Sequence, residues 1–247
     1  MDSQVKALLE AATRPHIAAG KYAWHFARGK LRHDPVYFFL LRRGLFPDRG
    51  SLLDLGCGQG ILLSLLKAAK EQYLAGSWPR DWPPPPLNLS LQGVELREDQ
   101  VQAARRALAG SVQVNRGDVR EIDLQPCSAI VMLDVLHYIG DEEQLRLLDR
   151  AAAALDPGGS LVLREADAGA GFAFQVTRWS EPIACALRGQ FGLTLHYRSA
   201  AQWIAELAGR GFAVTAEPMS EGTPFANVLF VARKNQDNPN QTADERG

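Results

Sequence analysis

The chain has 247 residues, of which 46% are hydrophobic and 22% are charged, a composition that is ordinary for a globular protein. One domain with additions is the expected architecture, and the chain is long enough to bury a large core. The formal net charge of −1 argues against a nucleic-acid partner. No apolar run approaches the roughly 20 residues that span a bilayer, and residues 1–10 lack a secretory core. We therefore expect a cytoplasmic protein without membrane insertion.

Residues 1–50 are expected to be helical and basic. They hold nine Lys or Arg and four Asp or Glu, a balance of 9 − 4 = +5. Asp34 and Pro35 are typical of a helix start, with a helix over 36–43 that stops at Gly44. The same segment carries six aromatic residues: Tyr22, Trp24, Phe26, Tyr37, Phe38 and Phe39. Solvated helices over core aromatics are the favoured interpretation, and a docking surface for an anionic substrate or an acidic carrier protein is the alternative.

From residue 51 the pattern alternates between strands and helices. Strands are expected over 52–55, 92–96, 112–115, 129–133 and 160–164, with helices over 61–74 and 98–109 between them. Asp141 is expected to cap a further helix, which ends at the turn 156–159. Ser199 and Gln202 have capping-box spacing for a later helix, and strands over 212–216 and 227–232 follow. This order predicts an α/β fold with a Rossmann-like, doubly wound, mostly parallel seven-stranded sheet and an antiparallel last strand.

Three stretches do not fit a bare sheet. Residues 76–90 contain Trp78, Trp82 and four consecutive prolines, which predicts a stiff extended loop that could fold over a bound ribose or substrate. Residues 166–198 are rich in glycine and aromatic residues and are expected to form a mobile lid over the substrate pocket. The tail from Asn235 is polar and expected to be disordered. The predicted division is a helical segment over 1–50, a ligand-binding domain over 51–234 and a tail over 235–247.

The most informative motif joins the first strand to the first helix of the alternating part. Asp54 is followed by glycines at alternate positions, Gly56, Gly58 and Gly60, with Cys57 between the first two. Glycines clear side chains from one strip of backbone, so that a flat, polar ligand can lie against it. Asp54 places a carboxylate at the strand end, where it can accept hydrogen bonds from an amine or from ribose hydroxyls. We interpret Cys57 as a packing residue.

This run resembles the first motif of class I S-adenosylmethionine (SAM)-dependent methyltransferases of the small-molecule type. The dinucleotide fingerprint of NAD-binding proteins would need a glycine at position 61, where this chain has Ile61. An NAD-dependent oxidoreductase is therefore the weaker alternative. A tight turn that binds no ligand is a third possibility.

Polar residues at the ends of the later strands extend the predicted cofactor site. Glu95 follows the second strand together with Leu96, and its carboxylate can accept both hydroxyls of a ribose. The resemblance implies that Asp118 holds the adenine amino group, that Val119 packs on the ring, and that Leu133 and Asp134 line the cofactor after the fourth strand. The three cysteines are widely spaced and lack metal-ligand spacing, so no metal is predicted.

His137 is the candidate catalytic residue. It lies just past the fourth strand, beside the expected position of the methyl group, and an imidazole titrates near neutral pH. The alternative is that it only packs against the cofactor. Five other residues could face the pocket, although the sequence does not place them: Arg32, His33, His196, Tyr197 and Arg198.

The predicted function is methyl transfer from SAM to a small-molecule acceptor, with an oxygen of an apolar or aromatic metabolite preferred. The segment after the fourth strand lacks the Asn-Pro-Pro-Tyr or Asp-Pro-Pro-Tyr sequence of amino methyltransferases that act on nucleic acid bases or protein glutamine. Methylation of carbon or nitrogen, on a free or a carrier-bound metabolite, is an alternative. A non-catalytic SAM-binding module is another, and the acceptor and the oligomeric state are left open.

Overall fold

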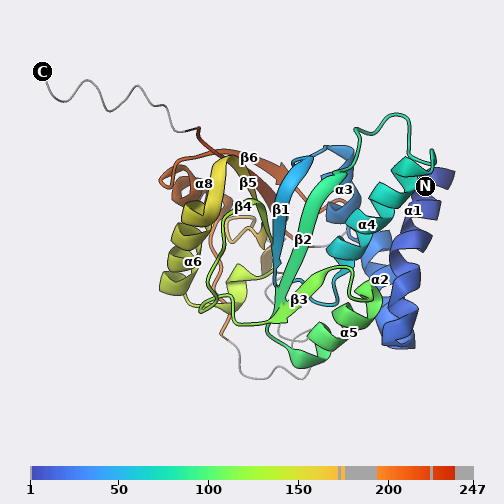
Figure 1. Cartoon of the computed structure of the whole chain (residues 1–247). Coiled ribbons are helices and arrows are strands. Elements are labelled where there is room, and N and C mark those ends of the chain that lie inside the picture. The colour runs from blue at the N-terminus through green and yellow to red at the C-terminus, as the bar shows by residue number, and fades with distance from the viewer. Residues whose placement is uncertain (1, 172–173, 176–193, 223–224, 237–247) are drawn as a thin grey trace, which may run out of the picture.

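A computed structural model describes residues 2–171, 174–175, 194–222 and 225–236 of the chain. Its centre is a seven-stranded sheet in the order β3-β2-β1-β4-β5-β7-β6, covered by helices on both faces (Figure 1). The strand order reverses between β1 and β4, because β1 pairs with β2 on one side and with β4 on the other. In an open α/β sheet, ligands bind at the carboxyl ends of the strands next to such a reversal.

The strands of the sheet confirm the predicted fold class. The first five strands pair in parallel, and the last, β7, is antiparallel to both of its neighbours, β5 and β6. The central strand β4 is continuously buried from its third to its sixth residue, as a strand covered on both faces should be. The bounds are β1 Arg49–Leu55, β2 Asn88–Glu95, β3 Gln113–Arg116, β4 Cys127–Leu133, β5 Leu155–Ala166, β6 Phe212–Pro218 and β7 Asn227–Lys234.

The N-terminal helices cover one face of the sheet together with the first two helices of the alternating part (Figure 1). Leu8 and Leu9 are buried in this layer, and each buried leucine contributes roughly 1.5–3 kcal/mol. The hydroxyl of Ser64 donates to the Ala12 carbonyl at 2.7 Å and joins the two sets of helices. The elements are α1 Ser3–Thr13, the 3-10 turn η1 Arg14–Ala19, α2 Lys21–His33, α3 Val36–Arg42, α4 Ile61–Leu74 and α5 Glu98–Leu108.

The opposite face is covered by α6 Asp141–Ala154 and α8 Ala200–Ala208 (Figure 1). The predicted capping box of α8 is confirmed, since the Ser199 side chain accepts from the Gln202 backbone and the Gln202 side chain accepts from Ser199 N. Trp203 on α8 is 1% exposed and anchors this helix in the core. A short 3-10 turn, η2 Leu136–Tyr138, lies between β4 and α6.

Three local expectations were wrong at the ends of elements. Asp141 does not cap α6: Gly140 is the N-cap, and its N–H donates to the Glu143 side chain at 3.2 Å. The predicted turn 156–159 lies inside β5, where an irregularity in the pairing with β4 accommodates the extra residues. The third helix starts at Val36 with Pro35 as N-cap, although Asp34 still accepts from Val36 N at 3.2 Å.

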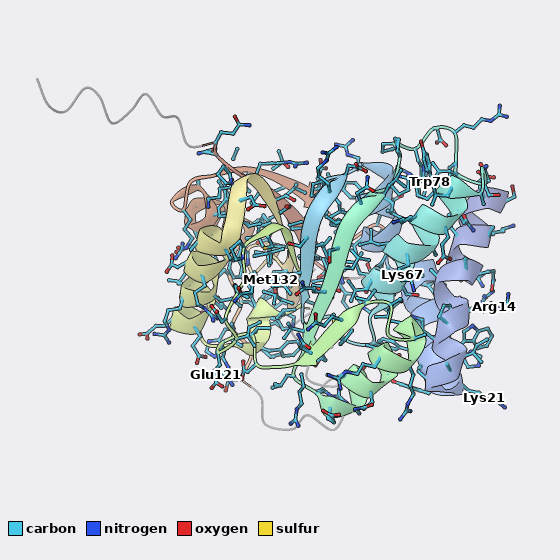
Figure 2. All side chains as sticks on the ribbon, viewed as in Figure 1. Arg14, Lys21, Lys67, Trp78, Glu121 and Met132 are labelled. Atoms are coloured by element: carbon cyan, nitrogen blue, oxygen red, sulfur yellow. The ribbon has the colours of Figure 1, made fainter. Side chains whose placement is uncertain are left out.

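The proline-rich insertion 76–90 also differs from the expectation that it could fold over a ribose or substrate. Trp78 and Trp82 are buried in an edge-on contact with ring centroids 5.6 Å apart, and the Trp78 carbonyl accepts from Gln4 at 2.9 Å. Figure 2 shows Trp78 beside the start of α1 and the end of α4. This is the end of the sheet at which β2 begins, opposite to the glycine turn. The insertion therefore extends the N-terminal core, and its last residues belong to β2.

Some expectations fall on residues that the structure does not describe. Residues 172–173 and 176–193 of the expected lid, and 237–247 of the expected tail, lie outside the described residues. The division of the chain into 1–50, 51–234 and 235–247 stays a prediction. Within the described part of the chain, no helix has the length and apolar character needed to cross a membrane.

Candidate functional site

The glycine turn 56–60 forms the floor of the candidate site at the end of β1. Gly56, Gly58 and Gly60 all have positive φ, at 74°, 54° and 75°, a conformation that other residues adopt with strain. The β2 strand holds the turn, because the Val94 carbonyl accepts from the backbone N–H of Gly56 at 2.8 Å and of Cys57 at 3.0 Å. A Cβ at Gly58 would meet nothing within 4 Å. The turn thus presents bare backbone to open space at this point.

Asp54 and Glu95 lie on either side of this turn. Asp54 is 4% exposed, and burial, followed by the charge of Glu95, raises the pKa of its carboxyl group to about 7. Glu95 accepts from Gly58 N at 3.0 Å through one oxygen and from Arg97 N at 2.9 Å through the other. Two carboxylates that repel each other in a buried place favour a cationic ligand. The structure thus brings together the predicted residues of the first two strands.

Cys57 packs inside the turn. It is 8% exposed, and burial raises the pKa of its thiol well above the ordinary range. A Cβ at Gly93 on β2 would lie 2.8 Å from the Cys57 sulfur, so the two residues fit only because both are small. A protonated, enclosed thiol is a poor nucleophile.

Asp118 and Val119, which were predicted to contact adenine, lie after β3, and Leu96, another predicted cofactor residue, lies after β2. Asp118 accepts from the backbone N–H of Arg120 at 2.9 Å and pairs with its guanidinium at 2.5 Å. The hydrogen bond from the Arg120 side chain is the main cause of the lowered pKa of Asp118. Val119 is buried, whereas Leu96 is 55% exposed. Asp118 would have to share its oxygens between Arg120 and any bound base.

An ion cluster lies at the end of β4, next to the partly buried Leu133. Asp134, with φ of 61°, accepts from the buried Arg164 through both carboxylate oxygens, and Arg164 also pairs with Asp34 at 2.5 Å. The ammonium of Lys30 lies 3.2 Å from Asp34 and 3.9 Å from Asp134. Burial alone would raise the pKa of Asp134, but the charges of Arg164 and Lys30 lower it to about 2. The cluster ties the corner between α2 and α3 to the sheet.

His137 and Glu165 form a buried pair beside this cluster. Nδ1 of His137 lies 2.6 Å from a carboxylate oxygen of Glu165, and the two side chains are 7% and 1% exposed. The other oxygen of Glu165 accepts from Val135 N at 3.0 Å and Leu136 N at 2.7 Å. A carboxylate oxygen accepts from an imidazole N–H, so this contact favours the tautomer with the proton on Nδ1. The carboxylate partner thereby fixes the orientation of the imidazole ring.

The described end of the expected lid, residues 194–198, packs against η2. The backbone N–H of His196 donates to the His137 carbonyl at 2.9 Å, and the Tyr197 ring stacks on the imidazole with centroids 5.5 Å apart. Gln144 on α6 donates to the carbonyls of Leu136 and His196 and accepts from Arg198 at 2.8 Å. Three of the residues that the sequence could not place thus lie around His137. Arg32 and His33 are exposed at the end of α2.

Sequence reasoning missed Glu165, Arg164, Asp34 and Lys30 as members of this site. Glu165 follows the same rule as the predicted acids, a polar residue at the carboxyl end of a parallel strand. The rule could have found it, because Glu165 directly follows the expected strand 160–164; the structure places it within β5, one residue before the strand ends. Lys30 and Asp34 precede the sheet, so no strand-end signal could have found them. Within the described residues, no group of three or more His, Cys, Asp or Glu side chains could hold a metal ion.

The chain is similar to several known proteins. The model of one family, described as a methyltransferase domain, matches residues 23–217. A carboxy-S-adenosyl-L-methionine synthase of Chromohalobacter salexigens is 33% identical over 117 residues, which are 45% of this chain and 38% of the relative. The chain thus matches well under two thirds of the length of the curated relatives.

Two solved structures share the fold. An O-methyltransferase family protein of Burkholderia thailandensis aligns with a TM-score of 0.62 at 17% identity, over 90% of this chain and 62% of that chain. An O-methyltransferase of neocarzinostatin biosynthesis, solved with S-adenosyl-L-homocysteine and 1,4-dihydroxy-2-naphthoic acid, aligns with a TM-score of 0.57 at 23% identity. That alignment covers 89% of this chain and 58% of the other.

Proposed function

This chain belongs to the methyltransferase domain family, and it is the class I SAM-dependent methyltransferase that its motifs predict. From this premise we propose that it methylates an oxygen of a small molecule. The observation that carries the choice of oxygen is the contact of 2.6 Å between His137 and Glu165. A hydroxyl group must lose its proton when it becomes an ether, and an oriented imidazole at the site removes it.

The residues around the glycine turn would hold the cofactor. Glu95 is suited to the ribose hydroxyls, the open backbone of Gly58 to close approach, and Asp54 to the ammonium of the methionine part. The raised pKa of Asp54 supports this fit, because a buried carboxyl group of this kind gains most from a cationic partner. When bound, SAM supplies a methyl group on a sulfonium, which is already an activated leaving group.

His137 would act on the acceptor. The acceptor oxygen would displace the sulfur from the methyl carbon, and Nε2 of His137 would take the hydroxyl proton as the new carbon–oxygen bond forms. The electrons of the broken bond stay on sulfur, so S-adenosylhomocysteine and the methyl ether are the products. Glu165 holds the ring in its tautomer and stabilises the imidazolium that results.

Aromatic rings near His137 favour an apolar or aromatic acceptor. Tyr138 lies next to the imidazole with centroids 4.1 Å apart, Tyr197 stacks on it, and Phe174 meets Tyr197 edge-on at 5.1 Å. Such a wall binds a flat ring by burial and by stacking. A phenolic hydroxyl also has a pKa near 10, so an imidazole base removes its proton more easily than that of an alcohol, whose pKa is higher.

The N-terminal face, formed by exposed residues of η1 and α2, bears on how the acceptor is delivered. Ile17, Tyr22 and Phe26 are exposed large apolar residues, and Arg14 and Lys21 lie exposed between and beside them. This basic, aromatic face favours, as a second candidate, an acceptor that is presented on an acidic carrier protein. Methylation of carbon or nitrogen remains the alternative if no hydroxyl compound is methylated.

The likeness to a carboxy-S-adenosyl-L-methionine synthase favours another candidate, in which SAM itself is the molecule that is modified. The two reactions leave different products. Methyl transfer releases S-adenosylhomocysteine and adds one methylene unit to the mass of the acceptor. Carboxylation of SAM would consume SAM together with a carboxyl donor, keep the sulfonium in the product and release no S-adenosylhomocysteine.

The first experiment is calorimetric titration of the purified chain with SAM, S-adenosylhomocysteine and NAD. Binding of both adenosyl ligands but not of NAD is expected. Incubation with SAM and a panel of phenols and hydroxynaphthoic acids, free and carrier-linked, should then give methyl ethers by mass spectrometry. Binding of NAD alone would overturn the proposal. Binding without transfer to any acceptor would indicate a non-catalytic module.

A further inference from the structure

We propose that Lys30, on the N-terminal helix α2, binds the carboxylate of the methionine part of SAM. The inference rests on the proposed use of SAM and names a residue that lies outside the glycine turn and the strand ends. The carrying observation is the place of the Lys30 ammonium, 3.9 Å from Asp134 at the end of β4 and 3.2 Å from Asp34.

The order of the strands sets the direction in which the cofactor lies. Glu95 at the end of β2 suits the ribose, and His137 after β4 must lie near the methyl group. Because β1 lies between β2 and β4, a cofactor with its ribose at Glu95 and its methyl group near His137 would place its methionine part over the ends of β1 and β4. That is the point where the strand order reverses, and Lys30 lies there beside Asp134.

The methionine part carries an ammonium and a carboxylate, and the site must satisfy both. Asp54 is a buried acid that suits the ammonium. The strand ends otherwise offer more acids, and a carboxylate near them needs a cation of its own. A Lys ammonium has three N–H donors, and the contact with Asp34 uses one of them.

Nearby arginines pair with acids, as Lys30 does, but they differ from Lys30 in burial or in position. Arg164 is 1% exposed and donates to both Asp134 and Asp34, so its guanidinium balances two carboxylates. Arg120 pairs with Asp118 on the far side of the site. The side chain of Lys30 is 34% exposed, and its flexible end can meet a ligand without leaving the cluster.

The cluster around Lys30 is electrically balanced. Asp34 and Asp134 carry two negative charges, and Arg164 and Lys30 carry two positive ones. A zwitterionic amino acid adds one charge of each sign, so its carboxylate can join Lys30 while its ammonium joins Asp54. The backbone of α2 is held in place by the buried side chains of Ala27 and Leu31.

The test uses a ligand that differs from SAM only at the group in question. Decarboxylated SAM keeps the amine and the sulfonium but lacks the carboxylate. Calorimetric titration of Lys30→Met should show an affinity for SAM that is about tenfold to a hundredfold weaker, the range of one charge-assisted hydrogen bond. Its affinity for decarboxylated SAM should stay within about twofold of wild type, since no carboxylate contact is lost.

Two further variants separate this role from a loss of structure or of general charge. Lys30→Arg should restore part of the affinity for SAM. Lys21→Met removes the same charge at the other end of the same helix, at the position labelled in Figure 2, and should bind both ligands as wild type does. An equal loss of both ligands in Lys30→Met would show a merely structural role and overturn the assignment.

A selective loss of SAM in Arg32→Met, with Lys30→Met unchanged, would overturn the assignment as well, because it would move the contact to the neighbouring cation. The proposed cofactor is tested separately by the wild type. If wild-type protein binds neither ligand, SAM use itself fails, and the role of Lys30 fails with it. If it binds both ligands equally, only the carboxylate contact is refuted.

Discussion

The side chain of Glu165 bridges the imidazole of His137 and the backbone of the turn that carries it. One oxygen meets Nδ1 at 2.6 Å, and the other accepts from Val135 N and Leu136 N. A single carboxylate thereby fixes the ring, its tautomer and the turn. Loss of Glu165 should therefore impair the base as well as its position.

Replacement of His137 by Ala is expected to lower turnover with an oxygen acceptor by about 10²- to 10⁴-fold, the contribution of a general base. The affinity for SAM should change little, because the base acts on the acceptor. Single-turnover kinetics and calorimetry measure the two quantities. Glu165→Gln should lower turnover as well, since an amide can favour the wrong tautomer. Full turnover in His137→Ala would remove this residue from the proposed role.

The affinity for SAM should rise with pH through about 7, the pKa of Asp54 in the free protein. Below that pH the carboxyl group holds a proton that must leave before it can meet an ammonium. The affinity should therefore fall by up to about tenfold per pH unit below 7 and level off above it. Asp54→Asn should abolish this pH dependence and weaken SAM binding by about 1–3 kcal/mol. Glu95→Gln should weaken SAM binding by a similar amount but leave the pH dependence in place. A flat profile in the wild type would contradict the assignment.

The same carboxyl group should destabilise the free protein at alkaline pH. Its folded-state pKa is raised above the ordinary value of 3.8, so the folded form binds the proton more tightly than the unfolded chain does. The free energy of unfolding therefore decreases as the pH rises from about 4 to 7. At pH 8, Asp54→Asn should raise Tm by at least about 2 °C, measured by circular dichroism. A lower Tm would show that ionised Asp54 is stabilised by its surroundings.

Gly56 and Gly58 should respond differently to alanine. A Cβ at Gly56 would lie 2.5 Å from Val135, so Gly56→Ala should destabilise the fold by several kcal/mol, about the range of overpacked and strained sites. At Gly58 the Cβ meets only open space, and the positive φ alone costs about 1–2 kcal/mol. Gly58→Ala should thus fold but bind SAM poorly. Urea unfolding and calorimetry test the contrast, and normal SAM binding by Gly58→Ala would place the ligand elsewhere.

Removal of Asp34 should be costly because Arg164 is buried. Asp34→Ala leaves one buried N–H group of the guanidinium without its carboxylate partner while the pairing with Asp134 remains, and such a loss destabilises proteins by about 1–3 kcal/mol. The exposed pair Arg28–Glu10 is the matched control, and Glu10→Ala should cost less than about 1 kcal/mol. Urea denaturation measures both values. Equal, small effects would show that water reaches Arg164 and replaces the lost partner.

Much of the sheet could be predicted from the sequence. The helix 61–74 has the predicted bounds, and the family implied by the glycine motif is confirmed. The spacing of apolar residues and the residue types at turns are local signals, and the fold class depends mainly on the order in which these signals follow one another. The ends of elements were less predictable: a continued pairing with β4 extends β5 back to Leu155, through a turn that looked like a stop.

The candidate site was predictable where its residues follow strands and not where they come from elsewhere. Asp54, Glu95 and His137 obey the strand-end rule, and their roles remain predictions. Lys30 and Asp34 reach the site because α2 and α3 fold back over the sheet, which is tertiary information. The insertion 76–90 was misplaced for a related reason. It was expected to be a stiff loop that could fold over a bound ribose or substrate, but its tryptophans are buried against the N-terminal helices.

The pairing of Arg164 with Asp34 and Asp134 also bears on how the chain folds as it is synthesised. Both carboxylates precede the arginine, one by 130 residues and the other by 30. At 5–20 residues per second, Asp34 is added to the chain roughly 7–26 s before Arg164. A solvated, unpaired aspartate costs little free energy, whereas burial of an unpaired guanidinium costs several kcal/mol, on the order expected for an uncompensated charge. Because of this order of synthesis, both aspartates are already present in the chain when the fifth strand joins the sheet and buries Arg164.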